Sequence, residues 1–171
     1  VFAATCHALE NGVPLAYDPN LRLKLWPLNR ARAIVLATVA KVDYLLPSED
    51  DAATLLGTRD RDTLADAFLE HGARHVVLKL GDEGALVASG EGRVHVPAHP
   101  VEAVDATGAG DTFDGAFLTR ILAGDEPVEA ARHAVVAAAL STKGHGAVAL
   151  MPTRDAVEAA RAEHGQEPAS S

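Results

Sequence analysis

The segment Gly108-Ala109-Gly110-Asp111 places two glycines and a carboxylate just before a stretch with helical spacing. Apolar residues recur there every three or four positions, which predicts a helix over 111–123 that Gly124 ends. A helix start leaves N–H groups unpaired and carries the positive end of the helix dipole, so it attracts anions such as phosphate. A carboxylate there also stabilises a helix without any chemistry, so the segment alone leaves both interpretations open.

Composition narrows the class of protein. The chain has 171 residues, of which 48% are hydrophobic, enough for the core of one domain. Its formal net charge of −9, without long runs of either sign, argues against nucleic-acid binding. No apolar run is long enough to span a bilayer, no export signal opens the chain, and a lone Cys6 cannot form an internal disulfide. We therefore expect a cytoplasmic protein with no nucleic-acid or membrane partner.

Helix and strand patterns alternate along the chain, which predicts an α/β fold with a doubly wound, mostly parallel sheet flanked by helices. The chain opens inside a helical pattern without Met, so we expect a fragment, and the polar end, 165–171, is expected to be disordered. Helices are predicted over 2–9, 29–40, 49–56, 62–70, 111–123, 128–142 and 153–163. Strands are predicted over 14–18, 42–46 and 75–80, with a hairpin pair at 84–89 and 93–98 and an edge strand at 100–104.

Ligands of such sheets bind beyond the carboxyl ends of the strands, where this chain has polar or glycine-containing loops. The sequence motifs of the common phosphate-binding loops are absent from these loops. The pattern Gly-x-x-x-x-Gly-Lys-Ser/Thr does not occur, and a dinucleotide fingerprint would put the large Phe113 at a position that requires a small residue. Histidines are scattered rather than placed at zinc-binding spacing.

Five segments resemble the ribokinase-like, or pfkB-type, carbohydrate kinases. In family order and spacing they read YDPNLRLKLW, LLPSEDDAATLLG, VVLKLGDEGALV, DATGAGDTFDGAF and ALSTKGHGAV, and they cover nearly the whole chain. The resemblance implies a ribokinase-like fold in which 1–164 form the C-terminal nucleotide-binding portion, without the N-terminal half and its β-lid. It also implies ATP and Mg²⁺ as cofactors, a small sugar or sugar acid as substrate, and possible pairing of the full-length protein as a homodimer.

The resemblance assigns roles within the glycine segment. Asp111 corresponds to the catalytic base that accepts a proton from the sugar hydroxyl, and Gly108, Ala109 and Gly110 correspond to the anion hole. These roles agree with the physics of phosphoryl transfer, in which positioning and charge stabilisation dominate. Asp105 is expected to orient the turn rather than to do chemistry.

The segment PSEDD aligns with the Asn-x-x-Glu motif of the family and departs from it. Ser48 stands at the Asn position and Asp51 at the Glu position. The resemblance places Ser48 at the nucleotide, and Asp51 keeps an oxygen able to hold Mg²⁺ through water. For Glu49 and Asp50, capping of the following helix explains the residues equally well.

Two further segments resemble the nucleotide site of the family. The first borders the ribose and phosphates and contains Lys79, Gly81 and Gly84. The second borders adenine and contains Ala138, Ala139, Lys143 and Gly144. Packing of a buried helix explains the alanines equally well.

The segment DPNLRLKLW resembles both 2-keto-3-deoxygluconate kinases and fructokinases. The resemblance places Asn20 and Arg22 at the bound ligands. The planar guanidinium of Arg22 can hold a carboxylate or a phosphate oxygen through two parallel hydrogen bonds, which a neutral sugar does not need. This favours transfer of the ATP γ-phosphate to 2-keto-3-deoxygluconate. A fructokinase, another sugar or nucleoside kinase, and a noncatalytic nucleotide-binding fragment remain the alternatives.

Overall fold

The computed structural model describes residues 2–164, so the expected tail at 165–171 lies outside it. The chain forms two compact units, which are described separately. The first unit runs to Gly81 and resumes over Ala85–His95, and the second contains Asp82–Gly84 and the chain from Val96 onward. Within residues 2–164, no helix combines the length and apolar character needed to cross a lipid bilayer.

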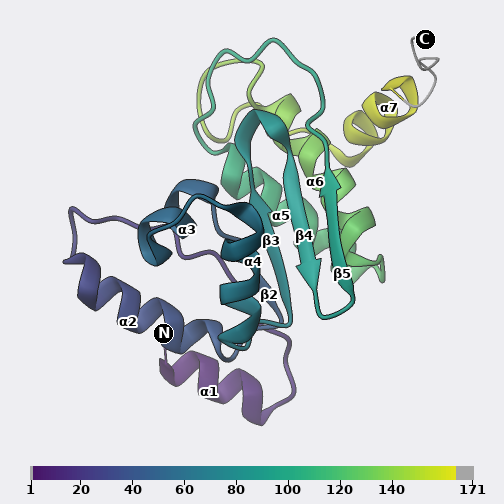
Figure 1. Cartoon of the computed structure of the whole chain (residues 1–171). Coiled ribbons are helices and arrows are strands. Elements are labelled where there is room, and N and C mark those ends of the chain that lie inside the picture. Colours follow the sequence, from purple (N-terminus) through teal and green to yellow (C-terminus); the bar gives the residue numbers. More distant parts are fainter. Residues whose placement is uncertain (1, 165–171) are drawn as a thin grey trace. The chain divides into compact units, whose positions relative to one another are not determined.

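A mixed sheet of five strands organises the first unit, in the order β1-β2-β3-β4-β5 (Figure 1). The strands are β1 (Ala16–Tyr17), β2 (Tyr44–Leu45), β3 (His75–Lys79), β4 (Ala85–Ser89) and β5 (Gly92–Val96). The first three are parallel to one another, whereas β4 runs antiparallel to β3 and turns into β5. The α/β class, the parallel strands and the hairpin are confirmed. The predicted strand at 14–18 is shorter, Ala16–Tyr17, and Leu15 N before it donates to the Asp43 carboxylate, 2.9 Å away.

Three helices and four strands of the first unit, α2 to α4 and β1 to β4, share one hydrophobic core. The helices of this unit are α1 (Phe2–Glu10), α2 (Leu28–Val39), α3 (Glu49–Leu56) and α4 (Arg61–Glu70). Val35 of α2, Leu55 of α3 and Phe68 of α4 are fully buried and pack in the same cluster as Val76 of β3. Burying each such side chain stabilises the fold by about 1.5–3 kcal/mol relative to exposure.

The second unit is built on helix packing. Its helices are α5 (Ala109–Leu122), α6 (Pro127–Ser141) and α7 (Arg154–His164), preceded by a short 3₁₀ turn, η1, at Gly81–Glu83 where the two units meet in sequence. Val136 and Ala137 of α6 pack against Val157 of α7 and Ala116 of α5. Helix α6 is buried along most of its length, as its apolar sequence predicts.

The edge strand predicted at 100–104 is wrong: this segment contains no strand. Its end pairs with a helix terminus instead, because Val104 N and Asp105 N both donate to Thr142 O, at 2.7 and 3.1 Å. Pro97 and Pro100 have no N–H to give to a ladder. The segment is therefore fixed by the end of α6, close to the start of α5.

Candidate functional site

The glycine segment forms the start of helix α5, as the sequence predicts. Gly108 is the N-cap residue and adopts a left-handed conformation, with φ of 80°. Within residues 2–164, no side chain caps the helix. Glycine adopts this conformation without steric cost, and the space that a Cβ of Gly108 would occupy is filled by Ala147.

Most of the first amide groups of α5 have no partner. The N–H groups of Gly108, Gly110 and Asp111 donate to no acceptor within residues 2–164, whereas Ala109 N donates to Ala106 O at 3.1 Å. Gly110 and Asp111 are exposed. The arrangement thus offers open amides at the positive end of a helix dipole, and it makes Ala109 the least available member of the expected anion hole.

Asp105 holds the loop before α5 in place. Its Oδ1 accepts from Thr107 N at 2.9 Å and its Oδ2 accepts from Gly146 N at 3.1 Å. Hydrogen bonds from the side chain and backbone of Thr107, followed by that from Gly146, lower the pKa of Asp105 to about 2. The expected orienting role of Asp105 is confirmed.

The segment after α6 lies beside this loop. A Cβ added to Gly108 would lie 2.9 Å from Ala147 Cα, so the two backbones approach closely. At Gly144 an added Cβ would lie 2.4 Å from Leu150 Cδ1, the end of an exposed side chain that can move aside. Lys143 is exposed and Ala138 half-buried at the end of α6. The second unit therefore brings the expected adenine segment next to the start of α5.

A buried hydroxyl beside Asp111 was not anticipated from the sequence. Thr112 is buried, and its Oγ1 has no hydrogen-bond partner in the described part of the chain. Other helical hydroxyls are satisfied, because Thr38 and Thr119 each donate to the carbonyl four residues earlier. A helical threonine normally has this local acceptor, so nothing in the sequence signalled the exception.

In the first unit, the loop after β1 carries Asn20 and Arg22. Asn20 N donates to Asp18 Oδ1 at 2.9 Å, and Asn20 has a φ of 40°. It is the only residue other than glycine with positive φ between residues 2 and 164. Arg22 is exposed and donates through Nη1 to Leu21 O at 3.0 Å, so its remaining donors point to no protein acceptor in the described residues.

Two side chains from other elements reach this loop. Lys79 Nζ, at the end of β3, lies 3.0 Å from Asp18 Oδ2. Asp51 Oδ2, in the first turn of α3, accepts from Leu21 N at 3.0 Å. Ser48 is the N-cap of α3, and its Oγ accepts from Asp51 N at 3.1 Å. The first unit therefore gathers the residues expected at the ligands from β1, α3 and β3.

The donor set around Asp51 is compatible with magnesium but sparse. Within residues 2–164, no group of three or more His, Cys, Asp or Glu residues is arranged to hold a metal ion. The second oxygen of Asp51, Oδ1, accepts no hydrogen bond there. Mg²⁺ usually takes one or two carboxylates and completes its shell with water and phosphate, so a single free carboxylate oxygen fits it.

The two glycines of the KLGDEG segment have different surroundings. Gly81 is exposed, with φ of 63° and open space around it. Gly84 is buried, and a Cβ there would lie 2.1 Å from Val96 O. Packing against the segment that begins at Val96 therefore explains Gly84 without a ligand, while Gly81 remains accessible.

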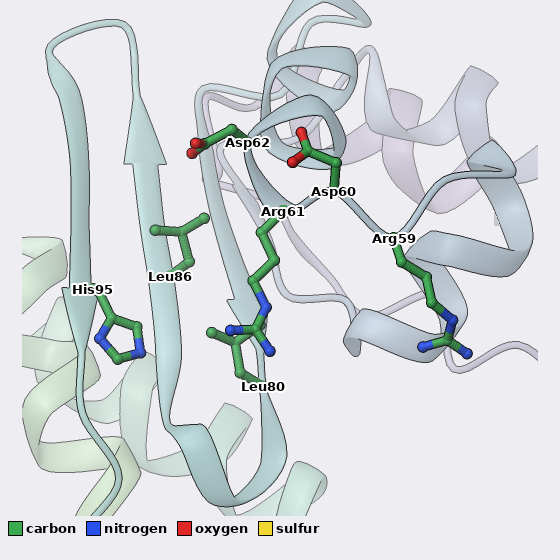
Figure 2. Close-up of a pocket in the computed structure, with 7 residues that line it drawn as sticks. All are labelled: Arg59, Asp60, Arg61, Asp62, Leu80, Leu86 and His95. Carbon is green, nitrogen blue, oxygen red and sulfur yellow. The ribbon is translucent and has the colours of Figure 1, made fainter.

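A pocket of about 370 Å³ opens elsewhere in the first unit (Figure 2). It is lined by Arg59, Asp60, Arg61, Asp62, Leu80, Leu86 and His95, none of which the sequence placed at a ligand. Its charged groups are engaged: Arg61 Nε lies 2.8 Å from Glu49 Oε1, and Asp60 caps α4 by accepting from Thr63 N. Because these charged side chains already have partners in the protein, the pocket does not indicate the charge of a ligand.

The geometry is that of an α/β protein in which a glycine segment forms the start of a helix without a side-chain cap, next to an exposed aspartate. Comparison with known proteins gives the family. Residues 1–154 match the pfkB family carbohydrate kinases, and the chain belongs to this family. The ribokinase-like fold and the membership expected from the five segments are confirmed, and kinases of this family are phosphotransferases.

Relatives differ in the substrates that their names give. An ATP-dependent 6-phosphofructokinase of Thermoanaerobacterium thermosaccharolyticum is 32% identical over 147 residues, covering 85% of this chain and 46% of that protein. A 2-dehydro-3-deoxygalactonokinase of Haloferax volcanii is 39% identical over 154 residues, covering 88% and 48%. The chain thus spans about half the length of these relatives.

A solved structure matches most of the chain. Aminoimidazole riboside kinase from Salmonella enterica, complexed with aminoimidazole riboside and an ATP analog, has a TM-score of 0.87 at 27% identity. The match covers 93% of this chain and 56% of that one. It supports both the fold and ATP as the nucleotide of such kinases.

Proposed function

We propose that the protein containing this chain is a sugar kinase that transfers the γ-phosphate of ATP to a hydroxyl of 2-keto-3-deoxygluconate. The observation that carries the proposal is the start of α5, where the N–H groups of Gly108, Gly110 and Asp111 have no partner within residues 2–164. Membership of the pfkB family supplies the reaction class.

In the proposed reaction, the open amides stabilise the charge that spreads over the transferring phosphoryl group. The Asp111 carboxylate accepts the proton of the sugar hydroxyl as that oxygen forms its bond to phosphorus, and the bond between phosphorus and the ADP oxygen breaks. Asp111 is exposed at the first turn of α5. The Asp105 clamp holds the loop that presents these groups.

Magnesium would be held by the free oxygen of Asp51 through water, together with the phosphates of the nucleotide. When bound, it would neutralise phosphate charge. Lys79, Gly81, Ser48 and the segment around Lys143 and Gly144 are proposed to contact the nucleotide. Gly84 and Ala138 are proposed as neighbours that shape the site through packing.

Arg22 supports an acid sugar as the acceptor. Its side chain is exposed, and only one of its donors is used by an acceptor in the described residues. A free guanidinium edge matches the carboxylate of 2-keto-3-deoxygluconate, whereas fructose offers no such group. The Haloferax relative is named for a sugar acid of the same kind, which also supports this choice.

The decisive experiment compares acceptors on the intact protein. Phosphorylation of 2-keto-3-deoxygluconate, fructose and ribose is followed by ADP release, with Asp111→Asn as the test variant. We expect turnover with the acid sugar, and a loss of several orders of magnitude in Asp111→Asn with little change in ATP affinity. Turnover of fructose alone would reject 2-keto-3-deoxygluconate as the substrate and identify the protein as a fructokinase. ATP binding without ADP release for any sugar would indicate a noncatalytic nucleotide-binding protein.

A further inference from the structure

Leu21 anchors the segment that carries Asn20 and Arg22. Leu21 is only 8% exposed and packs in the main hydrophobic core, whereas its two neighbours are exposed. The Leu21 amide has no backbone acceptor, and it donates to Asp51 Oδ2 at 3.0 Å. One side chain of α3 therefore satisfies the buried backbone at the centre of this segment.

The start of helix α3 fixes the backbone at Asp51. Ser48 caps the helix by accepting from Asp51 N at 3.1 Å, and the chain at Ser48 pairs with Lys79 of the neighbouring strand. A carboxylate in the first turn is also favoured by the helix dipole. Asp51 is half-buried and presents Oδ2 to Leu21 from the first turn of α3.

We propose that Asp51 is a positioning residue, whose hydrogen bond to the Leu21 amide sets the conformation of the segment from which Arg22 meets the acceptor. This inference rests on the proposed function and adds a second task to the residue expected at magnesium. The two tasks use different atoms, since Oδ2 holds Leu21 and Oδ1 is free within the described residues. A glutamate at this position would carry its oxygens one methylene further from the helix, so the aspartate suits the contact with Leu21.

Two substitutions of Asp51 distinguish its contact with Leu21 from its expected role in binding magnesium. Asp51→Asn keeps a side-chain oxygen that can accept from Leu21 N but removes the charge that a metal prefers. Asp51→Ala removes both. Asp50→Ala is the matched control, because Asp50 lies in the same turn, is exposed, and pairs with Arg59 rather than with the loop.

The first measurement is amide hydrogen exchange at Leu21 in the intact protein without ligands. We expect exchange to be about five- to tenfold faster in Asp51→Ala, the factor that one lost hydrogen bond predicts, and close to wild type in Asp51→Asn and Asp50→Ala. Wild-type exchange at Leu21 in Asp51→Ala would overturn the proposal. If that variant does not fold, Asp51→Glu serves in its place, because it keeps the charge and displaces the oxygen.

The second measurement is calorimetric titration with 2-keto-3-deoxygluconate. Asp51→Ala is expected to weaken binding by about tenfold, with affinity largely restored in Asp51→Asn, which a purely metal-binding role would not produce. Equal weakening in Asp51→Ala and Asp51→Asn would overturn the positioning role. Absence of binding in the wild-type protein would instead reject the proposed substrate, and the exchange measurement would still decide whether Asp51 holds Leu21.

Discussion

Lys79 and Asp18 join the carboxyl ends of two strands: Lys79 Nζ, after β3, lies 3.0 Å from Asp18 Oδ2, after β1. The side chains are 12% and 24% exposed, so the pair is largely shielded from water. Sixty-one positions separate them in the chain, with β2 between the two strands. The ion pair thus connects the loop after β1, which carries Asn20, to the end of β3 across the intervening strand β2.

We expect this ion pair to contribute more to stability than a surface pair does. In a double-mutant cycle with Lys79→Met and Asp18→Asn, the coupling energy from urea unfolding should be about 1–3 kcal/mol, between exposed and fully buried pairs. The control cycle uses Arg59 and Asp50, whose side chains are 72% and 82% exposed, and should give less than about 1 kcal/mol. Equal coupling in the two cycles would contradict the structural role of the Lys79–Asp18 pair.

Local sequence signals explain which parts of the fold were predictable. Helix α3 begins after Ser48 and ends before Gly57 as expected, because a capping side chain and a left-handed glycine act within one turn of the helix end. The segment 100–104 was predicted wrongly because its partner, Thr142 O, lies far along the chain. A strand pattern indicates extended backbone but does not identify the acceptor.

In the candidate site, too, features set by neighbouring residues were predictable from the sequence, and contacts between distant residues were not. The helix start at the glycine segment was predicted from local spacing, whereas GAGD alone left open whether a carboxylate or an anion would occupy that start. The contacts of Asp51 with Leu21 and of Asp105 with Gly146 join residues 30 and 41 positions apart, and no local pattern indicates them. The roles assigned to these residues in catalysis stay predictions until activity is measured.

Asn20 should tolerate glycine better than alanine. Its φ of 40° lies in the left-handed region, where asparagine is favoured over other side chains and glycine has no steric penalty. We expect Asn20→Ala to lower the free energy of unfolding by about 1 kcal/mol and Asn20→Gly to change it by less than about 0.5 kcal/mol. Thermal and urea unfolding measure both. A larger loss for glycine than for alanine would show that the Asn20 side chain, rather than the backbone, stabilises the loop.

A side chain at Gly108, the N-cap of α5, should destabilise the protein, whereas a side chain at Gly115 within α5 should not. A Cβ at Gly108 would lie 2.8 Å from Ala147 Cβ, and its φ is 80°. Gly108→Ala should therefore cost about 3 kcal/mol, combining left-handed strain and overpacking. Gly115, in α5, has nothing within 4 Å of an added Cβ, so Gly115→Ala should stabilise by about 0.5–1 kcal/mol.

The opposite signs expected for these two variants make the comparison informative. Urea unfolding of each variant against the wild type gives the free-energy changes directly. If Gly108→Ala were as stable as Gly115→Ala, the close approach between the loop before α5 and Ala147 would not exist in solution.

Asp105 should make the protein sensitive to acid in a defined pH window. Its pKa is lowered from 3.8 to about 2 by hydrogen bonds from Thr107 and Gly146. The folded protein therefore binds this proton more weakly than the unfolded chain, so the contribution to stability is complete above about pH 4 and is lost as the pH falls through about 2. The carboxylate resonance of Asp105 followed by NMR should titrate with a midpoint near 2. A midpoint near 3.8 would contradict the clamp.

Asp105→Asn tests the same clamp through stability. The amide keeps one acceptor oxygen for Thr107 or Gly146 but loses the charge that strengthens both hydrogen bonds. The variant should be less stable than the wild type at neutral pH, and the difference should shrink as the pH falls from about 4 to 2, because the wild-type carboxylate then takes up its proton. Other carboxylates titrate in both proteins, so the difference between them isolates Asp105. A difference that stays constant over this range would mean that the charge of Asp105 does not stabilise the loop before α5.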